Sequence, residues 1–556
     1  MHNLNELRTS IQQAHRAEER DIVAGLTAEA AISETTRADI ASDAAKLVSA
    51  IRTDEAPGLM EVFLAEYGLS TEEGVALMCL AEALLRVPDP ETMDDLIEDK
   101  IAPSAWGAHL GHSSSSLVNA STWALMLTGK VLDEDDAGTT GIARTLHGAV
   151  KRLGEPVIRR AVTRAMKEMG NQFVLGETIN EAVRRGQKWE GQGYTYSYDM
   201  LGEAALTASD AAEYFDAYKD AIENLSAHCK SSDIRENPGI SIKLSALHPR
   251  YELPKEKRVL TELVDSVKAL AMQAKNANMG LNIDAEEADR LDISLDVIER
   301  VFSDPDLAGW DGFGVVVQAY GKRAARVLDW LYALASNHDR KIMVRLVKGA
   351  YWDTEVKRAQ IDSVRDFPVF TRKSATDVSY ICCAKKLLGM TDRIYPQFAT
   401  HNAHTVTAIR QLADNDQPYE FQRLHGMGEA MHKIVMGNAG TRCRIYAPVG
   451  AHEDLLAYLV RRLLENGANS SFVNQIVDED VSPEEIAVDP FVTWEAERGE
   501  NNPAISKPRD IYQPERPNSK GWDLRDRADI ADIETARAPF QNHQWDVGPL
   551  LAIETK

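Results

Sequence analysis

The middle of the chain alternates short apolar segments with longer stretches whose apolar residues recur at helical spacing. Eight short segments rich in Val, Ile, Leu, Phe and Tyr predict β-strands. They span residues 194–201, 240–247, 281–287, 314–320, 342–349, 396–401, 419–426 and 443–450. Intervening segments such as KRAARVLDWLYALASN predict helices. Eight strands that alternate with helices predict an α/β fold of the (β/α)8 TIM barrel class.

Polar residues interrupt several of these strands at every second position or near their ends. They are Ser241, Lys243, Ser245, Asn282, Asp284, Glu286, Gln318, Arg345 and Gln422. Because successive side chains of a strand point to opposite faces, each polar set shares one face, which we interpret as the barrel lumen. Polar groups at the carboxyl ends of parallel strands predict a polar ligand at the barrel mouth.

Two adjacent arginines lie in the leucine-rich segment HEDLLAYLVRRLLENGAN, which follows the eighth strand. The spacing of Tyr458, Arg461, Arg462 and Glu465 predicts that they share one helix face. Taken alone, such a stripe is typical of a solvent-exposed helix face. Two guanidinium groups can also hold a small carboxylate bidentately. The position after the eighth strand and the inward-facing Lys243 favour the carboxylate clamp.

Cationic side chains outnumber acidic ones in this predicted site. The cations are Lys243, Arg345, Lys348, Arg461 and Arg462, and the acids are Asp284, Glu203 and Glu465. Because unpaired buried charge is very costly, the excess predicts phosphates, a carboxylate or both as ligands. Gly349 in RLVKGAYW would let a cofactor approach the backbone closely, and Gln318 and Gln422 could contact the polar edge of a ring.

Sequence motifs for metal binding, dinucleotide binding and nucleophilic catalysis are weak or absent in the chain. His401, His404, His425, Asp284 and Glu286 are metal-ligand types, but no HExxH motif is present, and His401 fits better as a donor to a phosphate. No G-x-G-x-x-G follows a strand, and no nucleophile elbow occurs. Two alternatives to a cofactor enzyme stay open at this point: a metal-dependent barrel hydrolase and a non-catalytic barrel scaffold.

The segments outside the barrel predict three further parts. Residues 1–59 are polar, alanine-rich and helix-prone, which predicts a helical arm. Residues 60–175 carry continuous helical signals and predict an all-α domain, followed by the barrel over residues 176–481. Residues 482–556 are rich in Pro, Asp, Glu and Asn and predict an extended, partly helical tail.

The composition narrows the classes of function. The formal net charge of -24 argues against a dominant nucleic-acid function, which needs a basic footprint. Five cysteines without a CxxC pattern fit a reducing cytoplasm. No signal peptide or apolar run of membrane-spanning length is present, so any membrane contact would be peripheral.

Successive motifs of the chain resemble a known family. SIKLSALHPRYE, NIDAEEADRL, VVQAYGKR, RLVKGAYWD, FATHNAHT, LHGMGE, CRIYAPVG and YLVRRLLENGAN occur in the order found in the proline dehydrogenase domain of the bifunctional flavoenzyme proline utilization A. The resemblance covers about residues 74–476. It implies a distorted (β/α)8 barrel that holds non-covalent FAD, oxidises L-proline to Δ1-pyrroline-5-carboxylate by hydride transfer from C5 to flavin N5, and passes electrons to a quinone in the membrane.

The resemblance also implies roles for individual residues. Lys243, Arg461 and Arg462 would bind the proline carboxylate, and the residues packing its ring would be Leu424, Tyr351, Tyr446 and Tyr458. The implied catalytic set is Arg345, Asp284 and Lys243. Glu203 would pair with Arg461 as a gate over the substrate. The implied FAD contacts are Asp284, Gln318, Arg345, Lys348, Gly349, Ala350, Trp352, Thr400, His401, Asn402, Gln422, Tyr446, Arg462, Glu465 and Phe472.

The chain also departs from parts of that family. Some members begin with a ribbon-helix-helix DNA-binding module, which this N-terminus does not match, and we expect no nucleic-acid partner. Members continue into an aldehyde dehydrogenase, so the tail would be a linker toward such a domain in a longer chain. The quinone acceptor implies a cytoplasmic enzyme with peripheral contact to the inner face of the cell membrane. Ser374 and Ala375 differ from the bulkier residues expected there, which puts flavin-adenine contacts of that stretch in doubt.

Overall fold

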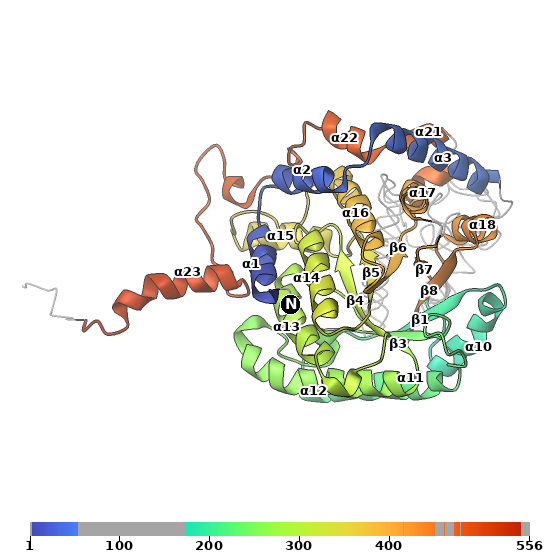
Figure 1. Ribbon diagram of the computed structural model, residues 1–556. Coiled ribbons are helices and arrows are strands. Elements are labelled where there is room, and N and C mark those ends of the chain that lie inside the picture. Colours follow the sequence, from blue (N-terminus) through green and yellow to red (C-terminus); the bar gives the residue numbers. More distant parts are fainter. Residues whose placement is uncertain are drawn as a thin grey trace, which may run out of the picture.

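Eight parallel strands close into a barrel in chain order in the computed structural model (Figure 1). The structure describes residues 3–53, 173–414, 416–450, 461, 472–478 and 480–545. The strands are β1 Thr195–Met200, β2 Gly239–Ile242, β3 Gly280–Ile283, β4 Phe313–Gln318, β5 Ile342–Val347, β6 Ile394–Ala399, β7 Glu420–Leu424 and β8 Arg442–Val449. Each predicted strand segment overlaps an observed strand, and the predicted barrel is confirmed.

Two strands, β2 and β3, end well before the residues that the sequence predicts. The chain leaves the sheet after Ile242 and after Ile283, so that Lys243 and Asp284 directly follow β2 and β3. Beyond β2 the backbone turns at once, because the amide of Ala246 donates to the carbonyl of Lys243 at 3.2 Å and a 3-10 turn covers Leu244–Ala246. Both charged residues therefore lie at the mouth of the barrel.

Helices cover the outside of the barrel. They are α11 Ala208–Ser226, α12 Glu256–Asn276, α13 Leu291–Phe302, α14 Ala324–Asn337, α15 Trp352–Ile361, α16 Lys373–Leu388, α17 Ala403–Leu412 and α18 Glu429–Ala439, and α10 Ile179–Glu190 precedes β1. In α12, Val259, Leu263 and Val267 recur every fourth residue and are fully buried. A capping box between Thr207 and Asp210 starts α11.

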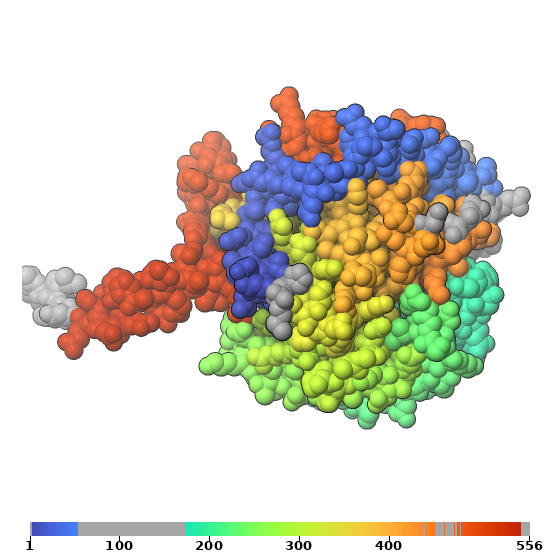
Figure 2. Space-filling model, in the orientation of Figure 1, coloured from blue at the N-terminus to red at the C-terminus, as the bar shows by residue number. Residues whose placement is uncertain are grey.

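Three N-terminal helices pack across the outer helices of the barrel (Figure 2). α1 Leu4–Ala14 packs on α14, α2 Glu19–Ala30 on α16, and α3 Glu34–Thr53 on α17. Polar bonds reinforce this packing: Glu19 Oε2 accepts from the amide and the hydroxyl of Thr371 at 2.9 and 2.8 Å. Arg8 donates to Asp296 at 2.7 Å. The arm thereby ties helices of different barrel units together.

The C-terminal segment also packs on the barrel and the arm. Its helices are α20 Phe472–Val477, α21 Pro483–Ile486, α22 Pro490–Ala496 and α23 Arg527–Arg537. Phe491 and Trp494 of α22 are buried in the main hydrophobic core. Beyond α22 the chain returns to the arm, and α23 then projects away from the barrel (Figure 1). The predicted all-α segment 60–175 lies almost wholly outside the described residues, and the division into domains stays a prediction.

Candidate active site

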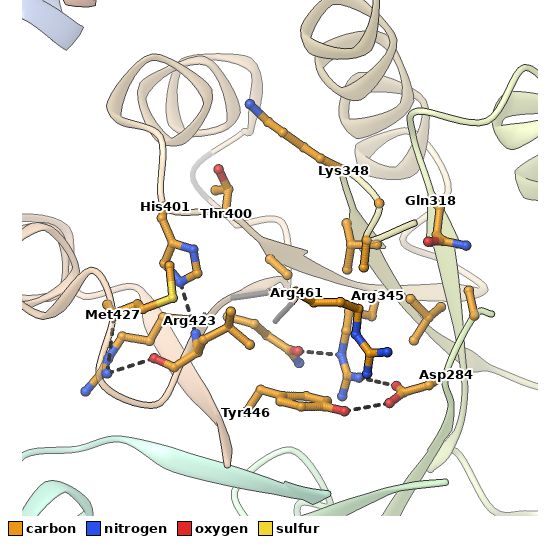
Figure 3. A pocket seen from close by; sticks show the side chains of 18 of the residues that line it. Asp284, Gln318, Arg345, Lys348, Thr400, His401, Arg423, Met427, Tyr446 and Arg461 are labelled. Atoms are coloured by element: carbon orange, nitrogen blue, oxygen red, sulfur yellow. Dashed lines mark hydrogen bonds and ion pairs between the residues drawn. The ribbon is translucent and has the colours of Figure 1, made fainter. Parts of the chain in front are cut away.

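A cavity opens at the carboxyl ends of the strands, where the sequence predicts a ligand (Figure 3). The space between its walls, together with the solvent at its open mouth, is about 1400 Å³. Its charged lining residues are Asp199, Lys243, Asp284, Arg345, Lys348, Lys373, Arg423 and Arg461. Apolar residues such as Val316, Val347 and Leu424 complete the wall. An apolar wall with a few convergent polar groups is typical of a cofactor or small-molecule site.

Arg345 on β5 is held from several sides. Its Nε donates to Gln422 Oε1 at 2.6 Å and its Nη1 donates to Asp284 Oδ1 at 2.7 Å. Its Nη2 donates to the hydroxyls of Ser197 and Ser241 at 3.1 and 3.0 Å. Only 3% of the residue is exposed. The guanidinium is therefore a fixed positive charge at the base of the cavity.

Asp284 links Arg345 to a second cation, Lys243. Tyr446 donates its hydroxyl to Asp284 Oδ2 at 2.7 Å, and its ring centroid lies 5.1 Å from Arg345 Cζ. Lys243 Nζ donates to Asp199 Oδ1 at 2.7 Å and lies 3.8 Å from Asp284 Oδ2. Burial alone would lower the pKa of Lys243, but Asp199 and Asp284 raise it well above its ordinary value. Lys243 is thus a buried amine that lies between two acidic side chains.

Arg461 closes one side of the cavity through a bidentate ion pair with Glu203. Its Nη1 and Nη2 donate to the two carboxylate oxygens at 2.7 and 2.9 Å. Its Cζ lies 5.4 Å from the ring centroid of Tyr351. Burial alone would raise the pKa of Glu203, but the hydrogen bonds and charge of Arg461 outweigh it and lower that pKa below its ordinary value. The pair is therefore charged at neutral pH.

A second cationic region lies where the chain leaves β5. Lys348 and Lys373 both donate to Asp377, the latter at 2.8 Å. Burial alone would raise the pKa of Asp377, but the two ammonium groups lower it. Gly349 follows with φ +138, and a Cβ there would lie 2.5 Å from the ring of Tyr320. Only glycine fits this position without strain.

Most of the predicted site residues meet in this one cavity. Those that line it are Lys243, Asp284, Gln318, Arg345, Lys348, Gly349, Ala350, Tyr351, Thr400, His401, Asn402, Gln422, Leu424, Tyr446, Arg461 and Phe472. Glu203 contacts the cavity through Arg461. Trp352 is not among the lining residues, because its indole N–H turns to the carbonyl of Phe370 at 2.7 Å. Tyr458, Arg462 and Glu465 lie outside the described residues.

Sequence reasoning missed several lining residues, among them Asp199, Lys373 and Met427. Asp199 was detectable, because it lies two residues after Ser197 and so shares its face of β1. The three tyrosines of the segment YTYSYDML lie at the alternate positions and so on the opposite face. Lys373 and Asp377 have the spacing of a helical ion pair, but nothing in the sequence places that pair beside β5.

The described residues were compared with the requirements of a metal site and of a membrane-spanning helix. No group of three or more His, Cys, Asp and Glu side chains suited to a metal ion occurs within them. None of their helices is both long and apolar enough to cross a membrane.

Family models match three consecutive parts of the chain. Residues 182–475 match the model described as proline dehydrogenase. Residues 59–173 match one described as the DNA-binding domain of proline dehydrogenase, and residues 5–52 match the proline utilization A proline dehydrogenase N-terminal domain. The description of the second model names DNA binding, so the absence of a nucleic-acid partner, expected from charge, stays a prediction.

Curated relatives and solved structures agree with these matches. The bifunctional protein PutA of Klebsiella aerogenes is 48% identical over 98% of this chain and 43% of its own length. The PutA of Rhizobium meliloti is 50% identical over 98% of this chain and 44% of its own length. The chain thus spans less than half the length of these relatives.

A crystal structure of a PutA mutant from Bradyrhizobium japonicum aligns with a TM-score of 0.73 at 46% identity, covering 94% of this chain and 52% of that one. Another PutA crystal structure aligns with a TM-score of 0.75 at 46% identity over 97% of this chain and 54% of the other. The barrel, its cavity and a family model that covers more than half of the chain lead to one conclusion. The chain belongs to the proline dehydrogenase family.

Proposed function

We propose that the protein is an FAD-dependent dehydrogenase that oxidises L-proline to Δ1-pyrroline-5-carboxylate, the first step of proline catabolism. The observation that carries the proposal is the pair of cationic groups Lys243 and Arg461 at the mouth of a cavity whose base holds Arg345. A barrel scaffold without catalysis would not need this buried charge, which costs stability.

The residues present fit FAD. The donors are suited to a flavin and its phosphates: Arg345 and Gln318 near the strands, and Lys348 farther out. Lys373 shares Asp377 with Lys348. Gly349 leaves room for close backbone approach. Helix α17 begins at Ala403, and its N-terminus carries the partial positive charge that favours phosphate. We assign Arg345 to the flavin ring and the Lys348 region to the phosphates.

The substrate region needs a carboxylate clamp. Lys243 Nζ uses one proton on Asp199 and keeps a charge that can bind a carboxylate. Arg461 supplies a planar, bidentate donor opposite, and the rings of Tyr351 and Tyr446 offer apolar faces to a small ring. Arg462 and Tyr458, by the family resemblance, complete the clamp. A small cyclic amino acid matches this combination of charge and apolar surface.

Catalysis then depends chiefly on orientation. The chemistry that FAD supplies when bound is the two-electron oxidation of the proline C5–N bond. The clamp fixes the substrate carboxylate and with it the direction of the ring. Arg345 supplies positive charge where a reduced flavin would carry its negative charge. The Glu203–Arg461 pair, by closing over bound substrate, keeps water out of the cavity.

We further propose the partners that the family resemblance implies. Electrons pass to a quinone of the membrane, so the enzyme works in the cytoplasm with peripheral contact at the inner membrane face. In the full-length chain, an aldehyde dehydrogenase domain takes up the product, in line with the bifunctional relatives.

The visible spectrum tests the proposed function. The purified protein, reconstituted with FAD where needed, is expected to be yellow and to bleach on anaerobic addition of L-proline. A metal-dependent hydrolase would instead carry metal and stay unbleached. A protein that binds no FAD, or a yellow protein that proline does not bleach, would overturn the proposal.

A further inference from the structure

A buried carboxylate lies one layer below the cavity, in the barrel lumen. Glu420 begins β7 and is 1% exposed. It does not line the cavity, but four donors face it. These are Gln397 Nε2 at 2.9 Å, Gln422 Nε2 at 2.7 Å, Arg444 Nε at 2.8 Å and Tyr395 Oη at 3.3 Å. The proposed mechanism assigns this group no task.

Glu420 determines which way the Gln422 amide points. A carboxylate can only accept, so the NH2 of Gln422 must face Glu420. The guanidinium of Arg345 can only donate, so the oxygen of Gln422 must face Arg345 Nε, as it does at 2.6 Å. Both neighbours of this buried amide therefore demand the same orientation.

The carboxylate itself cannot turn away. Arg444 donates to Glu420 and also to the carbonyls of Tyr196, Asn237 and Arg235 at 3.0, 2.9 and 2.7 Å. Its guanidinium is anchored to the backbone of the neighbouring strand and loop. A rigid chain of contacts thus runs from Arg444 through Glu420 and Gln422 to Arg345.

We infer that Glu420 is a positioning residue, which sets the place and the effective charge of Arg345 through the amide of Gln422. The inference rests on the proposed function for its flavin readout. Glutamine in place of Glu420 is neutral and leaves a single amide oxygen for the three donors that share Oε1, so it holds the Gln422 amide less firmly and Gln422 can turn. Arg345 would then lose an acceptor and act as a stronger positive charge on a flavin.

The test is the midpoint potential of FAD in the loaded protein, titrated with dithionite and reference dyes, so that no proline is needed. Glu420→Gln is expected to shift the potential to a more positive value. The matched control is Gln397→Met, which removes another donor to Glu420 but makes no hydrogen bond with Gln422. Its potential is expected to equal that of the unaltered protein. An unchanged potential in Glu420→Gln, or an equal shift in Gln397→Met, would overturn the inference.

Two further measurements keep the test decisive. If Glu420→Gln does not fold, Gln422→Met breaks the same series of contacts and leaves the Glu420–Arg444 pair intact. The same positive shift of the midpoint potential is expected, and an unchanged potential would contradict the inference. Where the protein takes up no FAD, the proposed function fails by itself. A cofactor-free crystal structure of Glu420→Gln then decides: Arg345 displaced from Gln422 supports the inference, and an unchanged 2.6 Å contact overturns it.

Discussion

Arg345 and Arg461 share one cavity, but their surroundings suit them to different tasks. The side chain of Arg345 is 4% exposed, and its acceptors all belong to the barrel interior. The side chains of Arg461 and Glu203 are 17% and 27% exposed, at the edge of the cavity. Arg461 is therefore accessible to a ligand carboxylate, whereas Arg345 can only act from a fixed position.

Arg461→Met tests the first of these tasks. We expect the KM for proline to rise by about a hundredfold, since a charge-assisted bidentate bond to a carboxylate is worth about 3 kcal/mol. FAD content should stay unchanged, because the flavin region is formed by other residues. Steady-state kinetics and the absorbance ratio of flavin to protein measure both.

A matched control is Arg442→Met, which removes an arginine at the opposite end of β8. Arg442 pairs with Glu236 at 3.2 Å and is partly exposed. Its KM is expected to equal that of the unaltered protein. An Arg461→Met enzyme with an ordinary KM would remove Arg461 from the substrate clamp.

Single residues could be predicted from sequence where a strand repeats its pattern. Lys243 and Asp284 extend the two-residue alternation of β2 and β3, so the sequence places them at the mouth. The partner of Lys243 could not be predicted, because Asp199 lies 44 residues earlier and the contact depends on the barrel closing between β1 and β2. The same holds for Glu420, whose neighbours come from β6 and β8.

At the scale of elements, site residues such as Lys243, Asp284 and Lys348 lie in the turns that follow the strands. The strands were predictable, because eight apolar runs of similar length alternate with helices. Their ends were not, because the sequence of β2 and β3 continues to alternate beyond the point where the chain leaves the sheet. The turn after β5 is tightly constrained, since Gly349 has φ +138 and packs against the ring of Tyr320.

Gly349→Ala is expected to lower the melting temperature and the FAD occupancy together. The added methyl would meet the ring of Tyr320 at 2.5 Å, and φ +138 is costly for any residue with a Cβ. Thermal unfolding with and without FAD measures both effects.

The matched control is Gly25→Ala, in the exposed face of α2, where a Cβ meets nothing within 4 Å. Alanine there should stabilise the protein by about 1 kcal/mol, because it favours a helix interior over glycine. Equal behaviour of the two variants would argue against a strained turn at Gly349.

At the scale of the whole molecule, the arm and the tail meet in a buried ionic cluster. Arg16 donates to Asp523 at 2.7 Å and to Asp526 at 2.9 Å. His15 Nδ1 lies 3.1 Å from Asp526. Burial is the main cause that lowers the pKa of His15 from 6.5 to about 4. The folded protein thus keeps His15 neutral where an unfolded chain would take up a proton.

This difference predicts a pH dependence of stability. Between pH 6.5 and about 4 the unfolded chain binds a proton at His15 that the folded chain does not, so stability falls as the pH falls. The loss is about 1.4 kcal/mol of unfolding free energy per pH unit. Other buried histidines share this trend, so the measurement is the difference between the unaltered protein and His15→Gln in urea unfolding at pH 7 and pH 5. If the unfolding free energy changes between pH 7 and pH 5 by the same amount in His15→Gln as in the unaltered protein, the prediction is wrong.

The arm has a consequence for how the chain is made. Arg16 bonds to Asp526, a residue 510 positions later. At about 5–20 residues per second, a ribosome needs roughly 25–100 seconds to synthesise that separation. The helices of the arm are synthesised before the barrel helices α14, α16 and α17 that they cover. A nascent chain must therefore keep the apolar face of the arm from aggregating until those helices and the acidic residues of the tail have been made.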